Sequence, residues 1–190
     1  MNLAAFLTGS LEALKGDESW RERYDLSRKG FQQSFAALIL SVPAYYIIAL
    51  GITRQRANLS GEAEAAVLSV PVFAIITLLY LLSFSACAYM IAMIFDRQDR
   101  FRPWVIVRHW TAFFMVLCVA TLFGGFLLGI VPFALANAAA FIVFMGTLAM
   151  DIRLAVCVVG FRWQAAIWTG CAVFASGLAM LIIGVMQVNG

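Results

Sequence analysis

The sequence predicts an all-α membrane protein, a polytopic bundle of five transmembrane helices with a cytoplasmic N-terminus and an outside C-terminus. Only 12% of the 190 residues are charged, and 64% are hydrophobic. Soluble domains carry roughly 25% charged residues, so this composition excludes an ordinary water-soluble core. The charged residues also gather in short clusters, and long apolar runs separate them.

The number of spans follows from four runs that contain no Asp, Glu, Lys or Arg. Because a bilayer core of roughly 30 Å needs about 20 helical residues, three of these runs supply one span each. The remaining run, 109–150, is about twice that length, and Gly124, Gly125, Gly129 and Pro132 near its middle mark a tight turn. The predicted spans are 32–52, 69–95, 109–129, 132–151 and 164–187.

Basic residues divide unequally between the two sides of the predicted membrane. All Lys and Arg residues except Arg54 and Arg56 fall in the N-terminal segment and in the loops after spans two and four. The positive-inside rule therefore places the N-terminus in the cytoplasm and the C-terminus outside. Arg is much more frequent than Lys, as in proteins from GC-rich bacterial genomes, so we expect a bacterial inner-membrane protein.

Residues 1–30 are predicted to form a cytoplasmic segment, followed by the transmembrane domain 31–190. Trp20, Tyr24 and Phe31 are expected to anchor the segment at the bilayer surface. We expect its first helix to lie on the membrane, and docking to a partner protein is the alternative. The apolar residues of that helix recur at three- and four-residue spacing: Leu3, Phe6, Leu7, Leu11 and Leu14.

Proline positions predict where the spans bend and where they begin. Pro43 lies near the centre of the first span, where it removes a backbone hydrogen bond and should kink the helix. Pro71, Pro103 and Pro132 fall near span starts, where the missing N–H costs nothing extra. Small residues in spans two and five suit close helix packing within the chain, or alternatively between copies in a homo-oligomer.

Ionisable groups are nearly absent from the predicted spans, so we expect no catalytic residue, no cofactor and no metal site. Asp151 is the one acid near a span, and it is predicted to pair with Arg108 and tie two cytoplasmic helix ends together. A proton or cation site is the alternative. His109 is the single histidine and has no ligand-spaced partner, so it is expected to be an interfacial anchor or a pH sensor.

A basic and aromatic cluster lies between spans two and three. Its net positive charge is small, and its place between two spans excludes nucleic acid as the partner. We expect contact with lipid headgroups or with a membrane protein partner. The residues proposed for this contact are Arg97, Arg100, Arg102, Trp104 and Arg108.

The order of a modest cytoplasmic segment, five spans, a very short turn between spans three and four and almost no tail resembles the Yip family. These are five-span membrane proteins that interact with Ypt/Rab GTPases, together with bacterial relatives. The resemblance covers residues 31–187. Eukaryotic members carry an Asp-Leu-Tyr-Gly-Pro motif before the first span, and the nearest match here is Tyr24-Asp25-Leu26-Ser27, without Gly-Pro. The resemblance implies a bacterial inner-membrane protein.

Two functions are compatible with these features. The first is a non-enzymatic protein that organises or assembles membrane partners in the Yip manner, which predicts a stoichiometric partner. The alternative is a small carrier or channel for a neutral or hydrophobic solute. For the carrier, the kink is assigned to Pro43, and the polar lining is assigned to Tyr45, Tyr46, Tyr80, Tyr89 and Asn137.

Overall fold

The structure is a computed structural model that describes residues 2–61 and 70–189. Every regular element within these two ranges is helical. The elements are α1 (Leu3–Lys15), α2 (Trp20–Arg23), α3 (Arg28–Ser60), α4 (Val70–Ile94), α5 (Gln98–Leu127), α6 (Phe133–Leu154), a π-helical turn η1 (Ala155–Val159) and α7 (Trp163–Asn189).

Four of the helices are long and apolar enough to cross a membrane, as judged by length and composition. They are α3, α4, α5, and α6 continued through η1. The predicted all-α class is confirmed for the described residues, and these four helices are candidate membrane spans. The fifth predicted span, 164–187, falls on α7, but it extends into 181–190, where most side chains lie outside the described residues.

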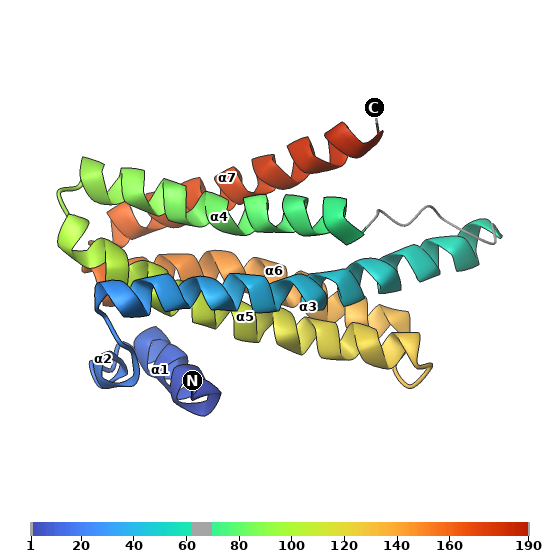
Figure 1. The fold of residues 1–190 in the computed structure, drawn as a ribbon, viewed down its shortest axis with the longest axis horizontal. Helices are drawn as coiled ribbons and strands as arrows, with labels where there is room; N and C mark the ends of the chain where they lie inside the picture. The colour runs from blue at the N-terminus through green and yellow to red at the C-terminus, as the bar shows by residue number, and fades with distance from the viewer. Residues whose placement is uncertain (1, 62–69, 190) are drawn as a thin grey trace.

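The five long helices contact one another in a closed ring. In order around the ring, α3 packs on α5, α5 on α6, α6 on α7, α7 on α4, and α4 on α3. Figure 1 shows the start of α3, the α4–α5 connection and the α6–α7 connection at one end of the bundle. The α5–α6 turn lies at the opposite end, together with the end of α7. The chain therefore enters and leaves the ring at opposite ends.

The connection between α5 and α6 is the tight turn that the sequence predicts. Leu127 ends α5, and Pro132 caps the start of α6 with an extended backbone. Gly129 between them has a φ of 77°, a left-handed conformation that glycine adopts without the steric cost of a Cβ atom. This glycine explains how the 42-residue uncharged run reverses direction.

Helix α5 begins at Gln98, well before the predicted start at 109. The hydropathy boundary marks where the chain becomes apolar, but the polar residues before it continue the same helix. Pro103 therefore lies inside α5, so its assignment to a helix start was wrong. Pro43 lies inside α3, as predicted, and Pro71 is the second residue of α4.

The N-terminal helices pack against the ring. The Phe6 ring stacks on Trp110 of α5 with centroids 4.3 Å apart. Arg153 of α6 donates from Nε to the carbonyl of Leu14 at 2.8 Å, and so satisfies the C-terminal end of α1. Cations are favourable at that end of a helix. The predicted amphipathic helix is therefore present and is fastened to α5 and α6.

Trp20 and Tyr24 are buried, so the prediction that they anchor the segment in lipid was wrong. They lie in the same hydrophobic core cluster as Trp104 of α5. The Tyr24 hydroxyl donates to the carbonyl of Phe6 at 2.8 Å, and burial raises the pKa of Tyr24 above its ordinary value. The aromatic residues of this segment thus hold α1 and α2 in place. The leucines of α1 named in the prediction that remain exposed are Leu3, Leu7 and Leu11.

Helices α3 and α5 pack tightly at Gly51, where a glycine lacks a side chain. A Cβ atom at Gly51 would lie 2.4 Å from Cδ1 of Phe123, whose ring is fully buried. Gly51→Ala should therefore lower the free energy of unfolding by about 1–3 kcal/mol, because the Phe123 ring must move.

Gly124→Ala is the matched control on α5, because its nearest atom would be 4.0 Å away. It should keep or raise stability, since alanine favours a helix over glycine by about 1 kcal/mol. Thermal unfolding of both variants in the same lipid nanodisc measures the difference. Equal midpoints would show that Phe123 has room to move.

Candidate functional site

An ion pair joins α5 to α6 inside the ring. Nε of Arg108 donates to Oδ1 of Asp151 at 3.1 Å, and the two side chains are 9% and 2% exposed. The structure thus brings together the pair that the sequence predicts. The pair was expected at the ends of the two helices. Arg108 instead lies roughly 15 Å along α5 from its first residue, Gln98.

The surroundings of the pair compensate for the loss of water around its charges. Cζ of Arg108 lies 4.3 Å above the centre of the Phe84 ring, which places the cation over the negative face of the aromatic system. Burial of charge is tolerated inside proteins when the charges are paired and hydrogen-bonded. Because α5 and α6 are both candidate membrane spans, such a pair marks a candidate functional site.

A cavity of about 360 Å³ opens beside the pair. Its walls are mainly apolar, with few polar groups, and its volume falls in the range of small-molecule sites, roughly 300–1,000 Å³. Residues of four helices line it: Tyr45, Ile48 and Ile52 from α3, Tyr80 from α4, Arg108, Ala112, Met115, Val116 and Val119 from α5, and Ala140, Val143, Phe144 and Thr147 from α6.

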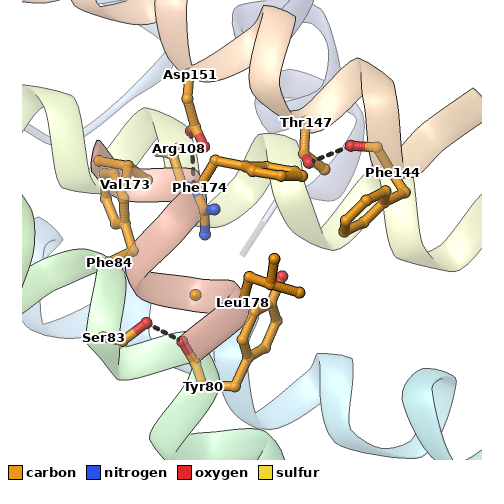
Figure 2. A pocket seen from close by; sticks show the side chains of 11 residues that line it. Tyr80, Ser83, Phe84, Arg108, Phe144, Thr147, Asp151, Val173, Phe174 and Leu178 are labelled. Carbon is orange, nitrogen blue, oxygen red and sulfur yellow. Dashed lines mark hydrogen bonds and ion pairs between the residues drawn. The ribbon is translucent and has the colours of Figure 1, made fainter. Parts of the chain in front are cut away.

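A small recess of about 20 Å³ continues the cavity toward α7. Tyr80, Arg108, Phe144 and Thr147 line both spaces, and Asp151 lines the recess. Figure 2 shows this recess with Asp151 and Arg108 on one side and Tyr80 on the other. Its size suits about one water molecule. The ion pair thus forms part of the wall between the apolar cavity and a narrow polar pocket.

A second buried group, His109, ties three helices together beside the pair. Its Nδ1 lies 3.1 Å from Oγ of Ser34 on α3, and its Nε2 lies 3.0 Å from Oγ of Ser85 on α4. Ser34 gives its own hydroxyl proton to the carbonyl of Phe31 at 2.8 Å. Ser34 therefore accepts from Nδ1–H, which leaves Nε2 to accept from Ser85.

With Ser34 as acceptor, the neutral imidazole of His109 takes the Nδ1–H tautomer, and both ring nitrogens are engaged. The side chain is fully buried, so the expected role as an interfacial anchor was wrong. The sequence contains no signal for this network, because its two serines come from separate helices and stand in ordinary apolar spans.

The basic cluster before the third span divides into an exposed and a buried part. Arg97 and Arg102 are exposed at the end of the bundle, and Arg100 is half-buried with its Nε 3.1 Å from Asp99. Trp104 and Arg108 are buried, so their assignment to lipid or partner contact was wrong. The reason is helical geometry, because α5 turns these two side chains toward its neighbours while the exposed arginines face outward.

Of the residues proposed as the carrier lining, Tyr45 and Tyr80 line the cavity. Tyr46 packs instead on Phe73, with ring centroids 5.5 Å apart, because adjacent residues of a helix point in different directions. Pro43 lines a separate groove between α3 and α5. The placement of Tyr46 in the lining was therefore wrong, and Pro43, which was assigned the kink, lies in α3 away from this cavity.

Asn137 is exposed near the start of α6 and does not line the cavity either. The cavity residues that sequence reasoning missed carry a helical spacing that could have identified them. Thr147 stands four residues before Asp151 on α6, and Ala112 stands four residues after Arg108 on α5. Residues at this spacing share one face of a helix.

No group of three or more His, Cys, Asp or Glu side chains that could hold a metal ion occurs among the described residues. The polar groups that line the cavity are instead hydroxyls and the Arg108 guanidinium, which donate or accept hydrogen bonds. Comparison of the chain with protein-family models, with curated proteins and with solved structures found no match.

Proposed function

We propose that this chain is a five-span inner-membrane protein of a bacterium that binds and carries a small, mainly apolar solute in the cavity of its helix ring. The observation that supports the proposal is the cavity of about 360 Å³ beside the Arg108–Asp151 pair. Charged side chains inside a membrane-spanning bundle are costly, and they occur where a substrate or ion passes. The proposal assigns binding and passage, and no chemical reaction, to this cavity.

The five-span topology takes α7 as the last span and the end that holds the α4–α5 connection as cytoplasmic. Cysteine labelling in a cysteine-free background tests it with two exposed positions, Asp99 before the third span and Ile130 in the α5–α6 turn. Asp99→Cys should react with an impermeant maleimide only after the cells are permeabilised, whereas Ile130→Cys should react in intact cells. Labelling of both from one side would contradict the topology.

Solute binding is tested by filling the cavity. Ala112 lines the cavity, so Ala112→Phe should occupy part of its volume and reduce solute binding at least tenfold. Ala138→Phe adds the same side chain at an exposed position of α6 and should leave binding unchanged. Octanol, octanoate and octylamine serve as probes, and the shift of the unfolding midpoint in nanodiscs reports their binding.

Uptake of the bound probe into proteoliposomes then distinguishes a carrier from a binding protein. If none of the three probes shifts the midpoint of the parent protein, or if Ala112→Phe binds as well as Ala138→Phe, the cavity is not a solute site and the proposal fails.

An organiser of membrane partners, as in the Yip family, is the second candidate. It is supported by an exposed leucine face on α1 and by exposed arginines at the end where the helices connect, both of which could receive a partner. Native mass spectrometry of the protein released gently from its own membrane separates the two functions. A partner at fixed ratio supports the organiser, whereas a monomer or homo-oligomer that retains a small molecule supports the carrier.

A further inference from the structure

We propose that the solute of this cavity carries an acidic head group and is bound together with one proton. In the bound state the solute anion pairs with the guanidinium of Arg108, and the carboxylate of Asp151 is protonated. This inference rests on the proposed function of the cavity and specifies the chemistry of its solute.

The guanidinium is placed to receive such a head group. Arg108 lines both the cavity and the recess, and its Nε–H is the group that bonds Asp151. In Figure 2 the terminal nitrogens of Arg108 lie on the side away from Asp151, toward Tyr80 and Leu178. A guanidinium has five N–H donors in a planar fork that matches a carboxylate or sulfonate oxygen pair. The apolar walls of the cavity then receive the hydrocarbon body.

Charge balance requires the proton. The Arg108–Asp151 pair is neutral as a whole, so binding of an anion alone would leave one uncompensated negative charge among apolar side chains. Such a charge is strongly disfavoured where the dielectric constant is low. A proton from bulk water that forms an O–H bond on the carboxylate of Asp151 removes this charge. The solute keeps its own charge, and no other bond is made or broken.

The same pair disfavours a cationic solute. An amine would have to take Asp151 as its counter-ion and would leave Arg108 charged and unpaired. Arginine does not lose its proton in proteins, whereas an aspartate can become neutral by gaining one. The two members of the pair are therefore unequal, and only the acidic member can be released from its partner without leaving a buried charge.

Other titratable groups near the pair do not take this role. They are Tyr45 from α3, Tyr80 and Cys87 from α4, and His109 beside Arg108 on α5. Phenols and thiols are uncharged near neutral pH and have no proton to gain. His109 holds both ring nitrogens in hydrogen bonds to serines. The described residues by which α7 lines the recess are Val173, Phe174, Gly177 and Leu178, which are apolar.

The test uses three probes with the same alkyl chain, namely octanoate, octanesulfonate and octanol. Octanesulfonate stays an anion at every working pH, so any proton taken up when it binds must go to the protein. Calorimetry in two buffers of different ionisation enthalpy counts the protons. We expect about one proton per octanesulfonate bound, and affinity that falls about tenfold for each unit rise in pH above neutrality.

The variants assign the proton to its residue. Asp151→Asn keeps a carbonyl oxygen for Nε of Arg108 and should bind both anions with no proton uptake and no pH dependence. Arg108→Met should lose the anions and retain octanol. Because either variant could misfold, its unfolding midpoint is measured in parallel, and the proton count of the parent protein with octanesulfonate decides without variants whether one proton is bound with the anion.

The outcomes separate this inference from the proposed function. Binding of octanesulfonate without proton uptake, or proton uptake that persists in folded Asp151→Asn, would overturn the role of Asp151. If octanol binds and neither anion does, the acidic solute is excluded while the apolar site remains. If no probe binds, both the inference and the proposed function fail.

Discussion

Replacement of Arg108 by Met, or of Asp151 by Leu, should each lower the free energy of unfolding by about 3–5 kcal/mol. Asp151→Leu leaves the charge of Arg108 unpaired, and Arg108→Met forces Asp151 to gain a proton without its hydrogen-bond donor, in a site where the two side chains are only 9% and 2% exposed. The double variant Arg108→Met with Asp151→Leu removes both charges and should lose less stability than either single variant. Unfolding in nanodiscs, followed by tryptophan fluorescence, measures all four proteins of the cycle.

A control for this cycle comes from the exposed ion pair at the start of α5. Arg100→Met and Asp99→Leu break a pair of similar length, 3.1 Å, but these side chains are 36% and 69% exposed. Exposed pairs contribute about 0–1 kcal/mol, so these changes should leave the unfolding midpoint nearly unchanged. If the buried and the exposed pair respond alike, water reaches Arg108 and Asp151 more freely than their burial indicates.

His109→Ala should produce the second large loss, about 3–5 kcal/mol of unfolding free energy. The change empties a fully buried volume between α3, α4 and α5, and large-to-small core changes of this size cost that amount. It also leaves the hydroxyl of Ser85 without the ring nitrogen that accepts its proton, which adds to the loss.

Thr121→Ala is the control on the same helix, because Thr121 is exposed and donates only to the carbonyl of Leu117 one turn earlier. It should change stability by less than about 0.5 kcal/mol. Ser85→Ala removes one hydrogen bond of the network and should fall between the two. A His109→Ala protein as stable as Thr121→Ala would mean that the histidine does not hold the three helices together.

The class of the protein and the positions of its helices could be predicted because they depend on local composition. An apolar run must satisfy its own backbone hydrogen bonds in a membrane, so a run of sufficient length becomes a helix wherever it stands. The turn at Gly129 and the proline inside α3 follow from local backbone chemistry in the same way. The pairing of Arg108 with Asp151 was also predictable, because Asp151 is the one acid near a predicted span and Arg108 directly precedes another predicted span on the same side.

The direction in which each side chain points was much harder to predict. In a soluble helix the buried face is apolar and the exposed face is polar, but a membrane helix is apolar on all sides because lipid is as apolar as the core. The spacing of apolar residues along a membrane helix therefore says little about which side of the helix faces the protein interior. Tyr45 and Tyr46 are adjacent in the sequence, which gives no reason to distinguish them. The packing of α3 places Tyr45 in the wall of the cavity and Tyr46 against Phe73.

The sequence by itself determined that the chain is helical and mostly apolar, where its long apolar segments lie, and that Arg108 pairs with Asp151. The tertiary structure decided that Trp104 and His109 are buried, that α1 packs against α5 and α6, and that a cavity opens beside the ion pair. The physical reason is that helix formation depends on the residues of one segment, whereas a cavity or a buried network depends on which faces of several segments come together.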